Sequence, residues 1–171
     1  EQSAARSIVD GVYAILDHEF GGGTRLRNVF RVTHYDKFYQ NVYPDNANAS
    51  SVTAAGTMRL AAYNNANLRT NVFNQTDVTF RATSGSIEHL LLTGVELGHQ
   101  DSKNKRNTGF FGPIASDNLI TVPATAPFAT AVRFQPNGSD ADNRVRADIF
   151  GVYVQDQLAL GRWHRGDVAA R

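Results

Sequence analysis

The chain has 171 residues, a formal net charge of +1 and no cysteine. This length suits one domain, the small charge argues against a nucleic-acid partner, and the lack of cysteine excludes disulfides and thiolate zinc sites. No stretch approaches the roughly 18 consecutive apolar residues of a transmembrane helix. Membrane-spanning strands stay compatible with the composition, because alternation of apolar and polar residues dilutes their hydropathy.

The first half of the chain predicts a hairpin followed by a loop. Residues 9–20 and 24–39 are predicted to be strands, and the three glycines at 21–23 favour a tight turn between them. Residues 40–56 are rich in asparagine, aspartate and serine. They are therefore predicted to form a polar loop.

The second half repeats this arrangement. Residues 57–82 and 87–99 are predicted to be strands on either side of a tight turn at Ser84, Gly85 and Ser86. Residues 99–144 hold four of the five prolines and are predicted to be a long irregular loop. Residues 148–163 then form the clearest strand and turn signal of the chain.

This last strand alternates strictly between two kinds of side chain. Phe150, Val152, Val154 and Leu158 share one parity, whereas the other parity is mostly small or polar. Eleven such residues extend roughly 35 Å, which covers most of a bilayer core when the strand is tilted. Asp156 has the apolar parity, but it lies near the Gly161 turn, where an acidic residue at the membrane surface costs little.

Two further patterns are consistent with strands between lipid and water. Arg25, Arg27 and Arg31 have the parity opposite to the apolar residues of their strand and are predicted to line a wet lumen. The alternative is a soluble sheet with a basic exposed face. Trp163 and Tyr13 would suit an aromatic girdle at the membrane surface.

The connections between strands alternate in length. Short turns at one end and long loops at the other are typical of outer-membrane barrels. We therefore expect an all-β, antiparallel up-and-down meander of about six long strands, with short periplasmic turns and long extracellular loops.

Three segments resemble the barrel strands of TonB-dependent outer-membrane receptors for ferric siderophores. In chain order they are LRNVFRVTHYDKFY (26–39), HLLLTGVELGHQ (89–100) and GVYVQDQLALGRW (151–163), which is also the order found in that family. The resemblance implies a 22-stranded barrel with a plug domain, located in the bacterial outer membrane. It also implies import of a ferric siderophore, energised by the TonB complex through the plug, with outer-membrane lipid around the barrel.

The chain carries no recognisable plug or TonB-binding segment and no signal peptide, and it ends in Arg171 rather than in an aromatic residue. We therefore expect residues 1–171 to be an internal part of the barrel domain. Such a piece is expected to aggregate in plain buffer, because its strand edges are unpaired.

The long loop is the expected place for ligand contact, since loops carry recognition on a rigid scaffold. Basic and aromatic side chains there suit an anionic ferric siderophore as the transported ligand. These candidates are Lys103, Lys105, Arg106, Phe110, Phe111 and Arg133.

No catalytic, metal or covalent cofactor site is expected. Asp17, His18 and Glu19 are adjacent on a strand and do not converge, and no glutamate completes a calcium loop around Asp140 and Asp142. The expected role is transport and not catalysis. The alternatives are another outer-membrane barrel, such as a porin-like channel, or a soluble all-β binding domain. The sequence does not identify the siderophore or the oligomeric state.

Overall fold

The structure, a computed structural model, describes residues 3–45, 52–113, 115–131 and 133–160. It contains five long strands, two short strands and one turn of 3-10 helix. These elements are β1 (Ala4–Phe20), η1 (Gly21–Gly23), β2 (Thr24–Pro44), β3 (Thr57–Ser84), β4 (Ile87–Phe110), β5 (Leu119–Pro123), β6 (Arg133–Gln135) and β7 (Asp142–Leu160). None of the described residues belongs to a helix with the length and apolarity needed to cross a membrane.

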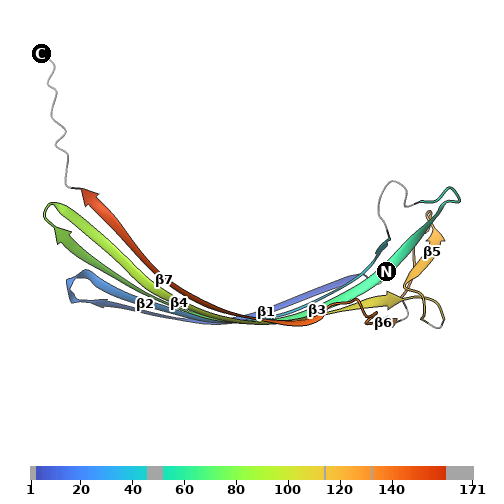
Figure 1. Ribbon diagram of the computed structural model, residues 1–171, viewed down its shortest axis with the longest axis horizontal. Coiled ribbons are helices and arrows are strands. Elements are labelled where there is room, and N and C mark those ends of the chain that lie inside the picture. The colour runs from blue at the N-terminus through green and yellow to red at the C-terminus, as the bar shows by residue number, and fades with distance from the viewer. Residues whose placement is uncertain (1–2, 46–51, 114, 132, 161–171) are drawn as a thin grey trace, which may run out of the picture. The chain divides into compact units, whose positions relative to one another are not determined.

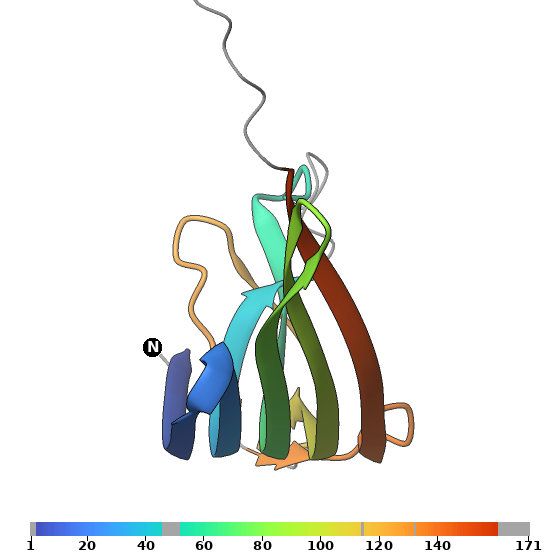
Figure 2. The same ribbon diagram turned by 90° about the vertical axis from the view of Figure 1, so that its left-hand side faces the viewer.

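All strands belong to one antiparallel sheet with up-and-down connections (Figures 1 and 2). The strand order is β1-β2-β3-β4-β6, with β5 beside β3 and β7 beside β4. The sheet is open, with β1 at one edge. The all-β meander predicted from the sequence is thereby confirmed, whereas closure into a 22-stranded barrel stays a prediction.

Glycines make both predicted tight turns possible. Gly22 and Gly23 between β1 and β2 have φ angles of 79° and 78°, and Gly85 between β3 and β4 has a φ of 62°. Only glycine adopts this left-handed region at little cost. Both turns close hairpins at the same end of their strands, as Figure 1 shows.

Most of the predicted strands are longer than expected, since β1 and β7 begin earlier and β2 and β4 end later. β2 continues to Pro44, and β4 continues to Phe110 through a stretch predicted to be irregular. Side-chain amides help to hold the extension of β4, such as Asn65 to Asn104 at 2.8 Å. A polar strand has no apolar alternation, and the prediction of a loop over residues 99–144 was therefore wrong at both ends. It was also wrong within the range, where β5 and β6 form. β7 likewise begins at Asp142, and the Gly161 turn and Trp163 lie outside the described residues.

The chain divides into two compact units, and each long strand contributes to both. Unit 1 comprises residues 1–11, 33–70 and 100–146, and unit 2 comprises residues 12–32, 71–99 and 147–171.

In unit 2 the two faces of the sheet differ in character. We name one the apolar face, defined by Val12, Leu16, Phe20, Phe30, Leu97, Phe150, Val152, Val154 and Leu158, all of which are exposed. Phe150 and Val154 each leave 72% of their surface uncovered. The opposite face, here the polar face, carries Arg25, Arg27 and Arg31. Tyr13 lines a hollow with Arg27 and Arg31. It therefore shares the polar face, and its place in an aromatic girdle stays a prediction.

Unit 1 contains a small apolar core. Phe111 is 1% exposed and packs with Ala62 and Ala131, and Val42, Ile120, Ala129 and Phe134 surround them. Gly109 allows this close packing, because a Cβ there would lie 2.6 Å from the Cβ of Ala62.

Candidate functional site

Three tyrosines and one arginine gather on one side of unit 1. Tyr39 and Tyr43 have the same parity on β2, and both rings meet the edge of Tyr63 on β3 at centroid distances of 5.6 and 5.4 Å. From β4, the guanidinium of Arg106 lies 4.0 Å from the centre of the Tyr63 ring. An arginine over an aromatic face is a favourable arrangement that also fixes the cation in place. We name Tyr39, Tyr43, Tyr63 and Arg106 the tyrosine–arginine cluster.

Asp140 holds Arg106 in position. Its Oδ1 lies 3.5 Å from Nε of Arg106. Its Oδ2 accepts hydrogen bonds from the backbone N–H and the hydroxyl of Thr108, at 2.7 and 2.9 Å. The Asp140 side chain is only 6% exposed. A buried carboxylate with several donors is firmly anchored, so it orients the arginine beside it.

A hollow of about 490 Å³ adjoins this cluster. Tyr43, Arg106, Thr108 and Asp140 line it from three different strands or connections, together with residues of the 118–119 and 137–141 segments. Asp45 is also at its wall and is paired with Arg59 at 2.6 Å. A fixed cation beside aromatic faces suits an anionic ligand with flat or aromatic groups.

The predicted contact residues Lys103, Lys105 and Arg106 do not form one site. Arg106 reaches Tyr63, whereas Lys105 has the opposite parity on β4 and lies 4.0 Å from Asp142. Lys103 shares the parity of Lys105 and is exposed. Alternation along β4 therefore divides these residues between two faces.

The other predicted contact residues are also separated. Phe111 belongs to the core of unit 1, so its prediction as a ligand contact was wrong, because a side chain 1% exposed has no free surface. Phe110 is half-buried and is paired in register with Arg133 of β6, which is exposed. The tyrosines were missed. Their signal was the common parity of Tyr39 and Tyr43, but the pairing of β2 with β3 was needed to add Tyr63.

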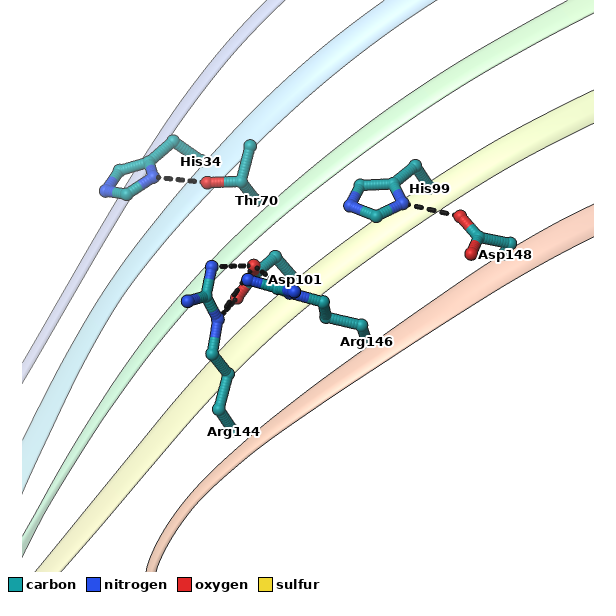
Figure 3. Close-up of polar contacts among 7 residues, drawn as sticks. All are labelled: His34, Thr70, His99, Asp101, Arg144, Arg146 and Asp148. Atoms are coloured by element: carbon teal, nitrogen blue, oxygen red, sulfur yellow. Dashed lines mark hydrogen bonds and ion pairs between the residues drawn. The ribbon is translucent and has the colours of Figure 1, made fainter.

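On the opposite parity of β4, Asp101 binds two arginines of β7. Nε of Arg144 lies 2.9 Å from each oxygen of Asp101, and Nε of Arg146 lies 3.2 Å from Oδ2 (Figure 3). These hydrogen bonds, that of Arg144 first, lower the pKa of Asp101 from its ordinary 3.8 to about 2, although partial burial opposes the shift. Asp101 therefore stays charged wherever the protein is folded above about pH 4.

Acid should release this contact only far below the usual range of an aspartate. Because folding lowers the pKa of Asp101, its charge stabilises the fold fully above pH 3.8, and this contribution is lost as the pH falls through about 2. We expect the carboxyl carbon of Asp101 to titrate near pH 2 in a carbon-13 NMR experiment. In the Arg144→Gln/Arg146→Gln variant the midpoint should move back towards 3.8, and an unchanged midpoint would contradict the pairing.

Unit 2 has its own polar network on the polar face. The hydroxyl of Tyr153 donates to Asp77 and accepts a hydrogen bond from Gln75 at 2.8 Å. Arg25 binds Asp17 through Nε at 2.7 Å. Arg27 and Arg31 line a separate hollow of about 410 Å³. The predicted location of the three arginines opposite the apolar side chains is confirmed for this unit.

Two pairs of polar residues on the apolar face bind each other. Asp156, the acidic residue with the apolar parity of β7, lies 2.7 Å from Nδ1 of His89. This partner lowers the cost of a carboxylate on the apolar face. Asn28 and Asn74 exchange hydrogen bonds at 3.1 and 3.2 Å. Paired amides cost far less than unpaired ones where water is scarce.

Among the described residues, no three histidine, aspartate or glutamate side chains form a group that could hold a metal ion. Asp17 binds Arg25, whereas the ring of its neighbour His18 packs against Phe20. Asp140 and Asp142 also take different partners, Thr108 and Lys105 respectively.

The described residues form an open antiparallel sheet, and its unit 2 has an exposed apolar face. The sequence matches no protein-family model and no curated protein.

Proposed function

We propose that this chain is part of an outer-membrane β-barrel that imports ferric siderophores with energy supplied through TonB. The observation that carries the proposal is the exposed apolar face of unit 2. Val12, Phe150, Val152 and Val154 each leave 65% or more of their surface uncovered. Soluble monomers rarely expose contiguous apolar patches of this kind. Lipid contact would remove the cost of that exposure.

The opposite face supports the same proposal. Arg25, Arg27, Arg31, Gln75 and Asp77 need water or polar partners, which a filled lumen provides. Strands that alternate between an apolar and a polar face are the sequence pattern of membrane barrels. The resemblance of residues 151–163, 26–39 and 89–100 to TonB-dependent receptors narrows the class from barrels in general to siderophore importers.

The tyrosine–arginine cluster is the proposed ligand contact. It lies on β2, β3 and β4, with the parity of the lumen-facing arginines on β2. Ferric siderophores combine anionic charge with chelated, often aromatic groups. Arg106 would supply the charge, and Tyr39, Tyr43 and Tyr63 the aromatic surface.

Site-directed spin labels test the lipid contact directly. The chain has no cysteine, so single cysteines introduced at Val152 and Val154 can be labelled without background. Matched labels at Gln155 and Gln157 report the other parity of the same strand. In the full-length protein, reconstituted into vesicles, we expect the first pair to collide with oxygen, which concentrates in lipid. The second pair should collide with a water-soluble nickel complex.

The rival functions predict other results. In a soluble all-β binding domain, the labels at Val152 and Val154 would be shielded from both reagents, and the protein would be monodisperse without detergent. In a porin-like channel the lipid contacts would be the same, but uptake of a ferric siderophore would not depend on TonB. TonB-dependent uptake therefore separates the importer from the channel.

A further inference from the structure

On one side of β7, the side chains change from basic to apolar along the strand. Arg144 and Arg146 are exposed and are followed at the same parity by Asp148, which is bound to His99, and then by Phe150 and Val152. Successive residues of one parity lie on one side of a strand. One side of β7 is therefore cationic at the start of the strand and apolar further along it.

The neighbouring strand β4 shows the same change in the opposite chain direction. From its end towards its start, one side of β4 carries Lys105, Lys103, Asp101 and His99, followed by Leu97 and Val95. The ion pairs from Asp101 to Arg144 and from Lys105 to Asp142 connect these two strand sides. Figure 3 shows both arginines of β7 turned towards Asp101. We name Lys103, Lys105, Arg144 and Arg146 the basic patch.

The basic patch keeps an excess of positive charge. Within unit 1, its four cations face two acidic groups, Asp101 and Asp142. Lys103 forms no ion pair with any residue that the structure describes, and Lys105 is only loosely paired at 4.0 Å. Arg144 and Arg146 share one carboxylate, so most of their N–H donors remain free for an acceptor.

We propose that the basic patch binds the phosphate of a lipid headgroup. Arginine pairs bind phosphate through several N–H groups at once, and Lys103 adds a mobile charge. This inference rests on the proposed function for the lipid environment of the two strands.

The test uses the full-length protein in a neutral detergent. Dioleoyl phosphatidic acid is the probe, because its headgroup is a bare phosphate, and dioleoyl phosphatidylcholine is the neutral comparison. Retained lipids are counted by native mass spectrometry over a titration. We expect at least about tenfold tighter retention of phosphatidic acid, since each basic residue near an anionic headgroup contributes roughly fivefold.

Two variants locate the binding. Lys103→Gln removes a charge without breaking an ion pair and should weaken retention of phosphatidic acid about fivefold. Lys103→Gln/Arg144→Gln/Arg146→Gln should abolish the preference for phosphatidic acid. The matched control, Arg27→Gln/Arg31→Gln/Lys37→Gln, also removes three cations but from the parity that carries Arg27 and Arg31 on β2. It should keep the preference.

Three results would overturn the proposal. One is an unchanged preference in the Lys103 variant and the triple variant, and another is an equal loss in the control. The third is full competition by millimolar inorganic phosphate, which would assign the patch to free anions. If the protein is monodisperse without detergent and retains neither lipid, the proposed function fails as well. If it needs detergent but does not distinguish the two lipids, only this inference fails.

Discussion

Replacing Arg106 by glutamine should weaken binding of an anionic ferric siderophore by about tenfold or more. The variant removes the only cation of the tyrosine–arginine cluster, and a hydrogen bond to a charged group contributes about 1.5–3 kcal/mol. Titration of the purified full-length protein with the ferric complex measures the change in Kd. Uptake of radioactive iron by cells should fall in parallel.

The matched control for this experiment is Lys105→Gln. Lys105 is the adjacent residue and carries the same charge, but its side chain lies at the opposite parity beside Asp142. Its removal should leave the Kd within about twofold. Equal losses in the two variants would mean that general charge attracts the ligand. Weaker binding in Lys105→Gln alone would place the ligand on the other face of β4. It would contradict the tyrosine–arginine cluster as the ligand contact.

Introducing a methyl group at Gly94 should destabilise the fold by about 2.5–6 kcal/mol. A Cβ at Gly94 would lie 2.6 Å from an oxygen of Asp77 and would also meet the ring of Tyr153. Tyr153 would have to move and would lose its hydrogen bonds to Asp77 and Gln75. Overpacking costs about 1–3 kcal/mol, and a lost hydrogen bond to a charged group adds about 1.5–3 kcal/mol.

Gly151→Ala is the control for Gly94→Ala. Gly151 lies on β7, and a Cβ there would have its nearest neighbour, the Cβ of Glu96, at 3.9 Å. This is ordinary contact, so the stability should change by less than about 0.5 kcal/mol. Urea unfolding of both variants in detergent gives the two free energies. Equal stabilities would show that Tyr153 has room to move and that the network around Asp77 is not tightly packed.

The alternation of apolar and polar residues made the centres of β2 and β7 predictable. Phe150, Val152 and Val154 identified the exposed side of β7, and the three arginines of β2 identified the other side. The glycines at 22, 23 and 85 identified both hairpin turns, because each needs a positive φ. Periodicity and turn chemistry are local properties, so one sequence was enough to find them.

The polar ends of the strands were not predictable in the same way. Residues 99–110 continue β4 because Asn104 and Asn107 find amide partners on β3. Such pairs depend on the register between strands, which the sequence of one strand does not carry. The candidate site failed for the same reason. Tyr63 and Arg106 are 43 positions apart, and only the pairing of strands brings them together.

The opposite sides of β4 also limit how the chain can change in length during evolution. Lys105 and Arg106 are neighbours, yet one contacts Asp142 and the other Tyr63. Deletion of one residue within β4 would move every later side chain to the opposite side of the strand. Removal of two residues would keep them on the same side and only shorten the strand. Natural variants should therefore gain or lose residues in even numbers inside the long strands, and odd-numbered changes should be confined to the connections between them.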